Sequence, residues 1–171
     1  LNCGIAVQIR GEPRFTSDID ICILSDLSDQ ERIINIKLKL QILVVNPKDL
    51  AETAQLLPII IDQVNVDLSL GLTGFEKQVI ERAPVEFLAE KINIKVATSE
   101  DLIIFKCLAG RPKDIQDIDS ILRKNLKTLD YLYIAQILKD FESVLETNDL
   151  LDLFNKRKVE IQTSISPNGV S

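Results

Sequence analysis

The stretch RFTSDIDICIL, residues 14–24, decides the fold because it sets two aspartates into an otherwise apolar strand pattern. Aspartate is unfavourable in strands, yet Asp18 and Asp20 alternate with isoleucines here. Residues i and i+2 of a strand point to the same face, so the two carboxylates are expected to project together, with their Cα atoms about 6–7 Å apart. Carboxylates this close repel each other, and a bound Mg²⁺ ion would relieve the repulsion. The stretch therefore predicts a strand that carries metal ligands.

A third acidic residue, Asp67, lies in the middle of another strand-like run, VNVDLSL. If this run pairs with the first strand, Asp67 can face the same point as Asp18 and Asp20. Three carboxylates at one point could hold two metal ions about 3.5–4 Å apart, which is the arrangement used for in-line phosphoryl displacement. An Asp-x-Asp pair alone is more often a solvated strand end, so the metal-site interpretation depends on the rest of the sequence.

The composition restricts the chemistry that the chain can support. Its 171 residues include no histidine, which excludes Ser-His-Asp and Cys-His sites and every histidine-ligated metal site. The net charge of −6 does not favour a broad basic surface for nucleic acid. A local basic patch could still form from Lys113, Arg123, Lys124 and Lys127. No apolar run has the length of a membrane span or resembles a signal peptide, so a cytoplasmic location without membrane contact is expected.

The order of the expected elements is typical of an α+β fold, with a mixed β-sheet flanked by helices and then a helical C-terminal part. The domain prediction is a sheet-containing core over 1–96, a helical region over 97–160 and a disordered tail over 161–171. Strands are expected at residues 15–24, 56–61 and 64–70, with a hairpin at 85–96. Helices are expected at residues 1–9, 28–40, after Pro47, 73–83, 98–110, 113–124, 128–146 and 149–159. Because the chain begins at Leu1 inside an apolar run, we expect that an upstream helix has been lost.

Local signals indicate where some of these elements begin and end. Pro58 has no N–H to donate within a sheet, so the first of the two paired strands is expected to lie at an edge or to begin late. The spacing of Thr73 and Glu76 predicts a capping box at a helix start. Thr98 and Gly110 are expected to cap the two ends of a single helix.

The segment CGIAVQIRGEPRFTSDIDI, residues 3–21, resembles the signature of the polymerase-β-like nucleotidyltransferase superfamily, a Gly-Gly or Gly-Ser turn followed by an Asp-x-Asp pair. It is most similar to the AbiEii-like abortive-infection nucleotidyltransferases, whose motif reads roughly GG-x-A-V and then G-x-x-R-x-T-x-D-I-D. The matching positions are Gly4, Ala6, Val7, Gly11, Arg14, Thr16, Asp18 and Asp20. Residues 66–83 and 97–118 resemble the family's third-carboxylate strand and its E-D-L-x-x-x-K…R-x-K-D-x-x-D stretch, so the resemblance covers nearly all of residues 3–125.

The resemblance implies a nucleotidyltransferase core over residues 1–96 that transfers a nucleoside monophosphate from an NTP to an acceptor hydroxyl of tRNA or of a protein. It implies that Asp18, Asp20 and Asp67 are the catalytic residues and hold Mg²⁺, or Mn²⁺ in its place. The residues implied in nucleotide binding are Gly4, Arg14, Thr16, Lys106, Lys113 and Asp114. Because members of this family are often the toxin of a toxin–antitoxin pair, an antitoxin protein is an expected partner.

Several of these residues also have a simpler structural explanation. Lys106 lies beside an apolar helix face, where a lysine can extend its aliphatic chain and keep its ammonium group in water. Asp114 is a favourable residue for the first turn of a helix. Arg14 could pair with Asp18 instead of with phosphate, and Thr16 could be an ordinary strand-forming residue. For each residue both explanations stay open.

The sequence departs from the family pattern at Cys3, which stands where the first glycine is usual. A side chain at that position would hinder the close approach of backbone amides to a triphosphate. Two alternatives to the transferase therefore stay open. One is a catalytically weak or inactive domain that keeps the fold for binding or regulation, and the other is a metal-dependent phosphohydrolase that uses the same carboxylates.

Overall fold

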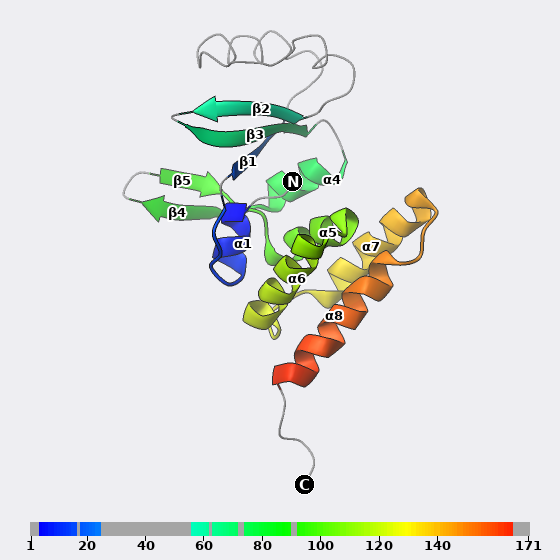
Figure 1. Ribbon diagram of the computed structural model, residues 1–171. Coiled ribbons are helices and arrows are strands. Elements are labelled where there is room, and N and C mark those ends of the chain that lie inside the picture. The colour runs from blue at the N-terminus through cyan, green and yellow to red at the C-terminus, as the bar shows by residue number, and fades with distance from the viewer. Residues whose placement is uncertain are drawn as a thin grey trace. The chain divides into compact units, whose positions relative to one another are not determined.

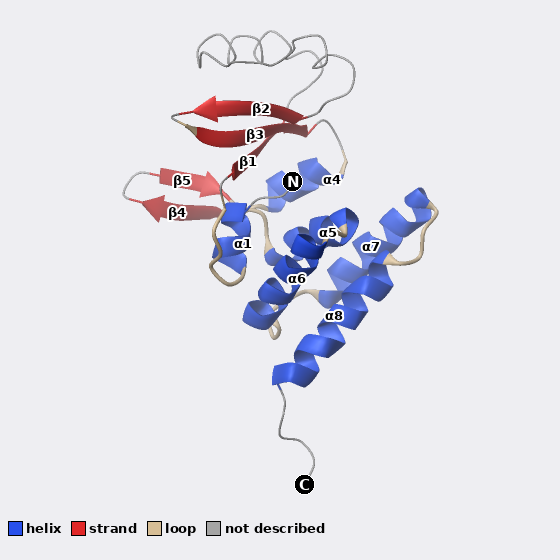
Figure 2. Ribbon diagram, in the orientation of Figure 1, coloured by secondary structure: helices blue, strands red, loops and turns tan. Residues whose placement is uncertain are grey.

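The computed structural model describes residues 4–16, 18–24, 56–61, 63–71, 74–89 and 92–165. The chain divides into two compact units, the first comprising Leu1–Ile5 and Arg14–Lys95 and the second comprising Ala6–Pro13 and Val96–Ser171. All described strands belong to the first unit, and the described part of the second is helical, as the red and blue colouring of Figure 2 shows. The α+β fold that the sequence predicts is therefore confirmed. The helices predicted at 28–40 and after Pro47, as well as Cys3, lie outside the described residues.

The first unit contains a three-stranded mixed sheet (Figure 1). Its strands, in the order β1-β3-β2, are β1 (Asp18–Leu24), β3 (Val64–Gly71) and β2 (Leu56–Ile61). β1 runs parallel to β3, whereas β2 runs antiparallel to it. Pro58 lies in β2 at an edge of this sheet, as predicted from its missing N–H.

Strand β3 has one apolar and one polar face because its residues alternate in character. Val66 and Leu68 are buried, with only 4% and 5% of their surface exposed. Asn65, Asp67 and Ser69 belong to the opposite face, since successive residues of a strand point to opposite sides. Burying a Val or Leu side chain contributes about 1.5–3 kcal/mol. The apolar face therefore stabilises the sheet, and the other face is available for polar side chains.

After the sheet, the first unit continues with a short helix and the predicted hairpin. The hairpin pairs β4 (Val85–Ala89) with β5 (Ile92–Lys95) in antiparallel fashion, and helix α4 (Phe75–Arg82) precedes it. The capping box predicted for the start of this helix is wrong, because the N-cap is Gly74 and no side chain caps the helix. Gly74 has a φ of 94°, a conformation that glycine adopts without strain. The helix therefore begins at Phe75, directly after this glycine. Thr73 lies outside the described residues.

Four helices of the second unit follow the order predicted from the sequence. They are α5 (Ser99–Ala109), α6 (Pro112–Asn125), α7 (Tyr131–Leu145) and α8 (Leu150–Ile165). The predicted caps of α5 are confirmed, since the Thr98 side chain accepts a hydrogen bond from the Asp101 amide and Gly110 adopts the left-handed conformation with φ of 62°. Helix α8 continues to Ile165, so the disordered tail predicted from residue 161 is wrong for 161–165.

The core of the second unit is formed by buried side chains of these four helices. Apolar residues of these helices with at most 1% of their surface exposed are Leu102, Ile103, Ile104, Ile118, Ile121, Leu122, Ile134, Leu138 and Phe154. Cys107 belongs to the same core, and burial raises the pKa of its thiol to about 12. This thiol therefore acts as a small core residue.

A segment from the beginning of the chain, Ala6–Pro13, also belongs to the second unit. It contains most of helix α1 (Gly4–Arg10), whose C-terminal carbonyl groups are bound by side chains of α6. Lys124 Nζ donates to the carbonyl oxygens of Ile9 and Gly11 at 2.9 and 3.2 Å, and Asn125 Nδ2 donates to that of Arg10 at 2.6 Å. A cation at a helix C-terminus is favourable. Lys124 thus has a structural role, which makes it a weaker candidate for the predicted basic patch.

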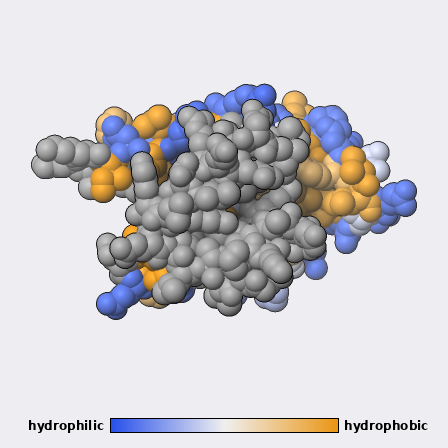
Figure 3. Space-filling model, turned by 90° about the horizontal axis from the view of Figure 1, so that it is seen from above, coloured by the Kyte–Doolittle hydropathy of each residue, from blue (hydrophilic) through white to orange (hydrophobic). Residues whose placement is uncertain are grey.

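The surface of the described residues combines polar and apolar areas. None of the described helices is long and apolar enough to cross a membrane. Large apolar side chains nevertheless reach the surface in both units, as at Phe15 and Phe87 in the first and Leu132 in the second. In the space-filling view of Figure 3, orange hydrophobic areas alternate with blue hydrophilic ones.

Candidate functional site

The acidic residues of β1 and β3 lie side by side in the parallel part of the sheet. Asp20 is the register partner of Asp67, and Asp18 is the register partner of Asn65. Neighbouring strands are about 4.8 Å apart, and side chains at paired positions point to the same face. The condition set by the sequence, that the strand of Asp67 must neighbour the first strand, is thus met. The side chain of Asp18 lies outside the described residues.

The polar face suits a hard divalent cation by the chemistry of its donors. Asp20 and Asp67 are partly buried carboxylates that come from two different strands, and carboxylate oxygens are the ligands that Mg²⁺ prefers. No hydrogen bond or ion pair of the Asp67 carboxylate occurs among the described residues. Within that part of the chain no three acidic, cysteine or histidine side chains form a metal-binding group, so two of the three predicted ligands, Asp20 and Asp67, are described.

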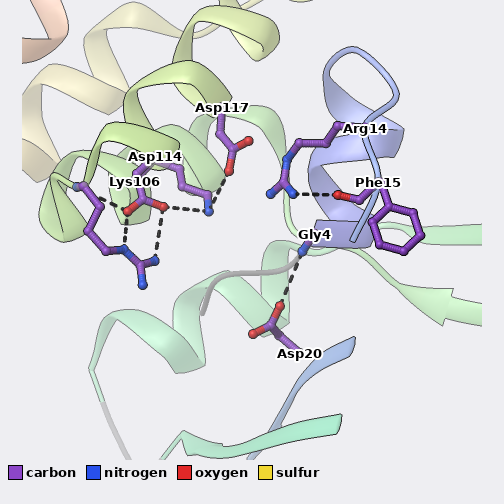
Figure 4. A network of polar contacts seen from close by, with 8 residues as sticks. Gly4, Arg14, Phe15, Asp20, Lys106, Asp114 and Asp117 are labelled. Atoms are coloured by element: carbon purple, nitrogen blue, oxygen red, sulfur yellow. Dashed lines mark hydrogen bonds and ion pairs between the residues drawn. The ribbon is translucent and has the colours of Figure 1, made fainter. Parts of the chain in front are cut away.

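The start of helix α1 is packed tightly against the loop that leads into β1. A Cβ atom at Gly4 would lie 2.4 Å from Thr16 Oγ1 and 2.7 Å from Thr16 Cβ, which is closer than atoms can approach. Only glycine therefore fits at this position. The Gly4 amide donates a long hydrogen bond of 3.4 Å to Oδ2 of Asp20, as Figure 4 shows. Gly4, Thr16 and Asp20 are thus brought together.

Two details of the loop before β1 differ from the sequence interpretation. The strand predicted from residue 15 begins at Asp18, so Thr16 belongs to the loop and the strand-forming explanation for it is wrong. Its side chain packs on Gly4 instead. Arg14 is partly buried, and its Nη1 donates to the carbonyl oxygen of Phe15 at 3.4 Å. Whether it pairs with Asp18 or with phosphate stays a prediction.

The second unit contains a separate cluster of buried charges on α5 and α6, drawn in Figure 4. Lys106 Nζ lies 3.0 Å from Oδ1 of Asp114 and 3.0 Å from Oδ2 of Asp117. Lys106 and Asp117 are each 1% exposed and Asp114 is fully buried. The proposal that Lys106 keeps its ammonium group in water is therefore wrong, because the ammonium group is buried between two carboxylates.

Arg111 adds a second positive charge to this cluster. Its Nε lies 2.6 Å from Oδ2 of Asp114, and its backbone amide donates to the same oxygen at 3.3 Å, so Asp114 also caps the start of α6. Burial by itself would raise the pKa of Asp114, but hydrogen bonds from Arg111 and Lys106 and their positive charges outweigh it and hold that pKa below its usual value. With Asp117, the cluster has two positive and two negative groups.

The predicted nucleotide-binding residues of the second unit differ in their burial and in their ion pairs. Lys106 and Asp114 are paired with each other, whereas Lys113 is exposed on α6. Asp117 and Arg111 were not among the predicted site residues. Asp114 and Asp117 are three residues apart, a spacing that puts both on one helix face. That spacing could have indicated a shared partner, although the sequence does not say which one.

Asp101 is a further buried carboxylate, and its contacts are structural. Thr98 Oγ1 donates to its Oδ2 at 2.8 Å, and the hydroxyl group of Tyr133 on α7 donates to its Oδ1 at 2.7 Å. Asp101 therefore closes the start of α5 and connects this helix to α7.

The comparisons with known proteins agree with this arrangement at the level of the family. Residues 4–163 match the family model described as "Nucleotidyltransferase of unknown function" (DUF6036). A search of curated proteins gives no match. The matched residues include all of the described strands and helices α5, α6 and α7, and they end within α8. The chain therefore belongs to this family of nucleotidyltransferases.

Proposed function

We propose that this chain transfers a nucleoside monophosphate from an NTP to an acceptor hydroxyl, using the polar face of β1 and β3. The observation that carries the proposal is the register of the two strands, which sets Asp20 opposite Asp67 with Asp18 one pair further along. The family description supports the reaction class. The finer assignment, to the AbiEii-like members of the polymerase-β-like superfamily, rests on the motif in residues 3–21.

In this proposal Asp18, Asp20 and Asp67 hold Mg²⁺, or Mn²⁺ in its place. When bound, such ions would stabilise the negative charge that develops on the phosphate oxygens. Asp67 would also orient the acceptor hydroxyl and take up its proton as the oxygen attacks the α-phosphorus and pyrophosphate leaves. The three carboxylates would thus perform positioning and proton transfer without a histidine, which the sequence lacks.

Other residues of the first unit would position the triphosphate. Gly4 permits the close contact with Thr16, which fixes the backbone at the start of α1 beside Asp20. Arg14 supplies a cation in the same loop. The roles of Lys106, Lys113 and Asp114 in nucleotide binding remain part of the proposal. Of these, Lys113 is the exposed cation.

The acceptor in this proposal is a tRNA or a protein, and an antitoxin protein would inhibit the enzyme. A second candidate function is a catalytically weak domain that binds nucleotide without transferring it. The observation that favours it is Cys3, which replaces the first glycine of the family motif.

The test is to incubate the chain with each α-labelled NTP, MgCl₂ and either total tRNA or a cell extract depleted of nucleic acid. The proposal expects labelled RNA or labelled protein, and loss of the label in Asp20→Asn and in Asp67→Asn. Asp152→Asn, which neutralises an exposed carboxylate on α8, is the matched control and should keep full activity. Nucleotide binding without a labelled product would favour the binding domain. Phosphate release without a labelled acceptor would favour a phosphohydrolase.

A further inference from the structure

Helix α1 is shared between the two compact units. Its first residues, Gly4 and Ile5, belong to the first unit, and its residues from Ala6 onward belong to the second. The helix is continuous across this boundary and, with seven residues, is about 10 Å long. Because its backbone hydrogen bonds make it stiff, a displacement of one end is carried to the other. The contacts of each end are therefore linked through α1.

The first residue of α1 contacts a candidate metal ligand. The Gly4 amide donates to Oδ2 of Asp20 at 3.4 Å, and the contact of Gly4 with Thr16 leaves no room for a side chain. Figure 4 shows this amide directed at the carboxylate. Groups that hydrogen-bond to metal ligands orient those ligands, and their loss commonly weakens metal binding 10- to 100-fold. A shift of Gly4 would therefore change how Asp20 is presented to a metal ion.

The other end of α1 is held by three polar side chains of α6. Lys124 and Asn125 donate to the carbonyl oxygens of residues 9–11 at distances between 2.6 and 3.2 Å. Ser120, one helical turn before Lys124, accepts a hydrogen bond from the Glu12 amide at 2.5 Å. We call Ser120, Lys124 and Asn125 the anchor residues. Their hydrogen bonds fix the C-terminal end of α1 within the second unit.

Packing at this end of α1 is also close. A Cβ atom at Gly11 would lie 2.4 Å from Ser120 Oγ and 3.0 Å from the carbonyl oxygen of Val7, which is closer than ordinary contact allows. Ala6 and Val7 are buried, with 1% and 0% of their surface exposed. The C-terminal end of α1 therefore has little freedom to move as long as its contacts with α6 are intact.

We propose that the anchor residues Ser120, Lys124 and Asn125 are positioning residues, which act through α1 to hold the Gly4 amide on the Asp20 carboxylate and so increase the affinity of the site for a divalent cation with nucleotide. Each hydrogen bond in this argument lies within one unit, and α1 itself joins the two units covalently. This inference rests on the proposed function, because it assigns a control of the same site. It goes beyond the family motif, since the anchor residues lie outside the stretches that resemble it.

The test removes the donors that hold α1. Lys124→Met/Asn125→Leu keeps the approximate size of both side chains but none of their donors to the carbonyl oxygens. The matched control is Asn155→Leu/Lys156→Met, the same two exchanges at neighbouring exposed positions of α8. Mn²⁺ affinity is measured by electron paramagnetic resonance with non-hydrolysable analogues of the four NTPs, at a temperature where thermal unfolding shows each variant to be folded.

A further control reports what destabilisation of the second unit does by itself. Arg157 on α8 binds Asp119 on α6 through Nε at 2.7 Å and Nη2 at 2.5 Å, and neither residue contacts α1 through a described hydrogen bond or ion pair. Arg157→Met should therefore lower the melting temperature without changing the affinity for Mn²⁺ and nucleotide.

Lys124→Met/Asn125→Leu should weaken the binding of Mn²⁺ with nucleotide by at least about fivefold, the lower end of the coupling usual between separate sites. Asn155→Leu/Lys156→Met should not change this affinity. The assignment is overturned if Lys124→Met/Asn125→Leu binds like the unmodified chain, or if either control loses as much affinity.

A second measurement uses the unmodified chain alone. Coupling between two sites is reciprocal, so saturating Mn²⁺ and nucleotide should slow hydrogen exchange of the Glu12 amide, which donates to Ser120, by at least about fivefold. The Thr147 amide, which donates to the Glu142 carbonyl oxygen at the end of α7, should exchange at an unchanged rate. Unchanged exchange of the Glu12 amide on binding overturns the assignment, even where Lys124→Met/Asn125→Leu does not fold.

The same data separate this inference from the proposed function. If the unmodified chain binds Mn²⁺ with nucleotide and transfers label, but Lys124→Met/Asn125→Leu binds both unchanged, only the role of the anchor residues is refuted. If the unmodified chain neither binds Mn²⁺ with any of the four analogues nor transfers label, the proposed function is refuted and the role of the anchor residues with it.

Discussion

Asp20 and Asp67 lie directly opposite each other in the parallel strands β1 and β3, although 46 residues separate them in the chain. Two acidic side chains are thus brought to one face of the sheet. This pair is the structural basis of the proposed nucleotidyl transfer.

Neutralising one member of this pair should abolish most of the transfer activity without lowering the free energy of unfolding. Two like charges about 5 Å apart repel by about 1 kcal/mol in water, so Asp67→Asn should leave the free energy of unfolding unchanged or raise it by up to about 1 kcal/mol without divalent cations. Transfer should fall by at least about 100-fold, because a metal ligand is lost. Urea denaturation with and without MgCl₂ checks the first part, and label transfer the second. A clear loss of stability in Asp67→Asn would instead assign the residue a structural role.

The contact between Gly4 and Thr16 predicts a coupled pair of substitutions. Gly4→Ala places a methyl group 2.4 Å from Thr16 Oγ1, so it should reduce the free energy of unfolding by about 1–3 kcal/mol. Thr16→Gly removes the atoms that clash. The double variant should therefore recover most of the loss, and a double-mutant cycle by urea denaturation measures this coupling. Additive effects of the two substitutions would show that the two residues do not contact each other.

The buried cluster in the second unit predicts that substitutions of Lys106 and Lys113 differ strongly in their effect on the free energy of unfolding. Lys106→Met leaves Asp114 and Asp117 buried without their shared cation, so the free energy of unfolding should fall by about 3–5 kcal/mol. Lys113→Met, at an exposed position of α6, should change it by less than about 0.5 kcal/mol. The triple variant Lys106→Met/Asp114→Asn/Asp117→Asn also neutralises both carboxylates, so it should recover part of the lost free energy of unfolding. Equal effects of the two lysine substitutions would contradict the described cluster.

The lowered pKa of Asp114 predicts how stability depends on pH. Its carboxyl group binds protons more readily in the unfolded chain, where its pKa is near the ordinary value of 3.8, than in the folded chain. The contribution of this carboxylate to the free energy of unfolding is therefore present above pH 3.8 and is lost as the pH falls through the lower pKa of the folded chain. Asp114→Asn removes this contribution, so its free energy of unfolding should fall less steeply than that of the unmodified chain below about pH 4. Parallel acid titrations of unfolding in urea make the comparison, and identical slopes would argue against the ion pairs.

Much of the first unit could be predicted because its signals are local. Alternation of apolar and polar residues gave the strands, and Pro58 gave the edge position of β2. The alternation also set Asp18, Asp20 and Asp67 on predictable faces, although only the fold could show that β1 and β3 are neighbours. The start of α4 was missed because the positive φ of Gly74 is a property of the loop and not of the capping pattern.

The features that could not be predicted depend on residues far apart in sequence. The segment Ala6–Pro13 joins the second unit through donors on α6, Lys124 and Asn125, and no local pattern indicates this. Likewise, the burial of Lys106 follows from its two partners on another helix. From the sequence alone, a lysine beside an apolar face is equally compatible with an ammonium group in water.

The most direct test of the central claim is a crystal structure of the chain with Mn²⁺ and a non-hydrolysable NTP analogue, using the anomalous signal of manganese to locate the ions. We expect manganese bound to carboxylate oxygens of Asp18, Asp20 and Asp67, with the triphosphate beside Gly4. Manganese and nucleotide bound elsewhere, with the polar face of β1 and β3 in contact with water alone, would contradict it.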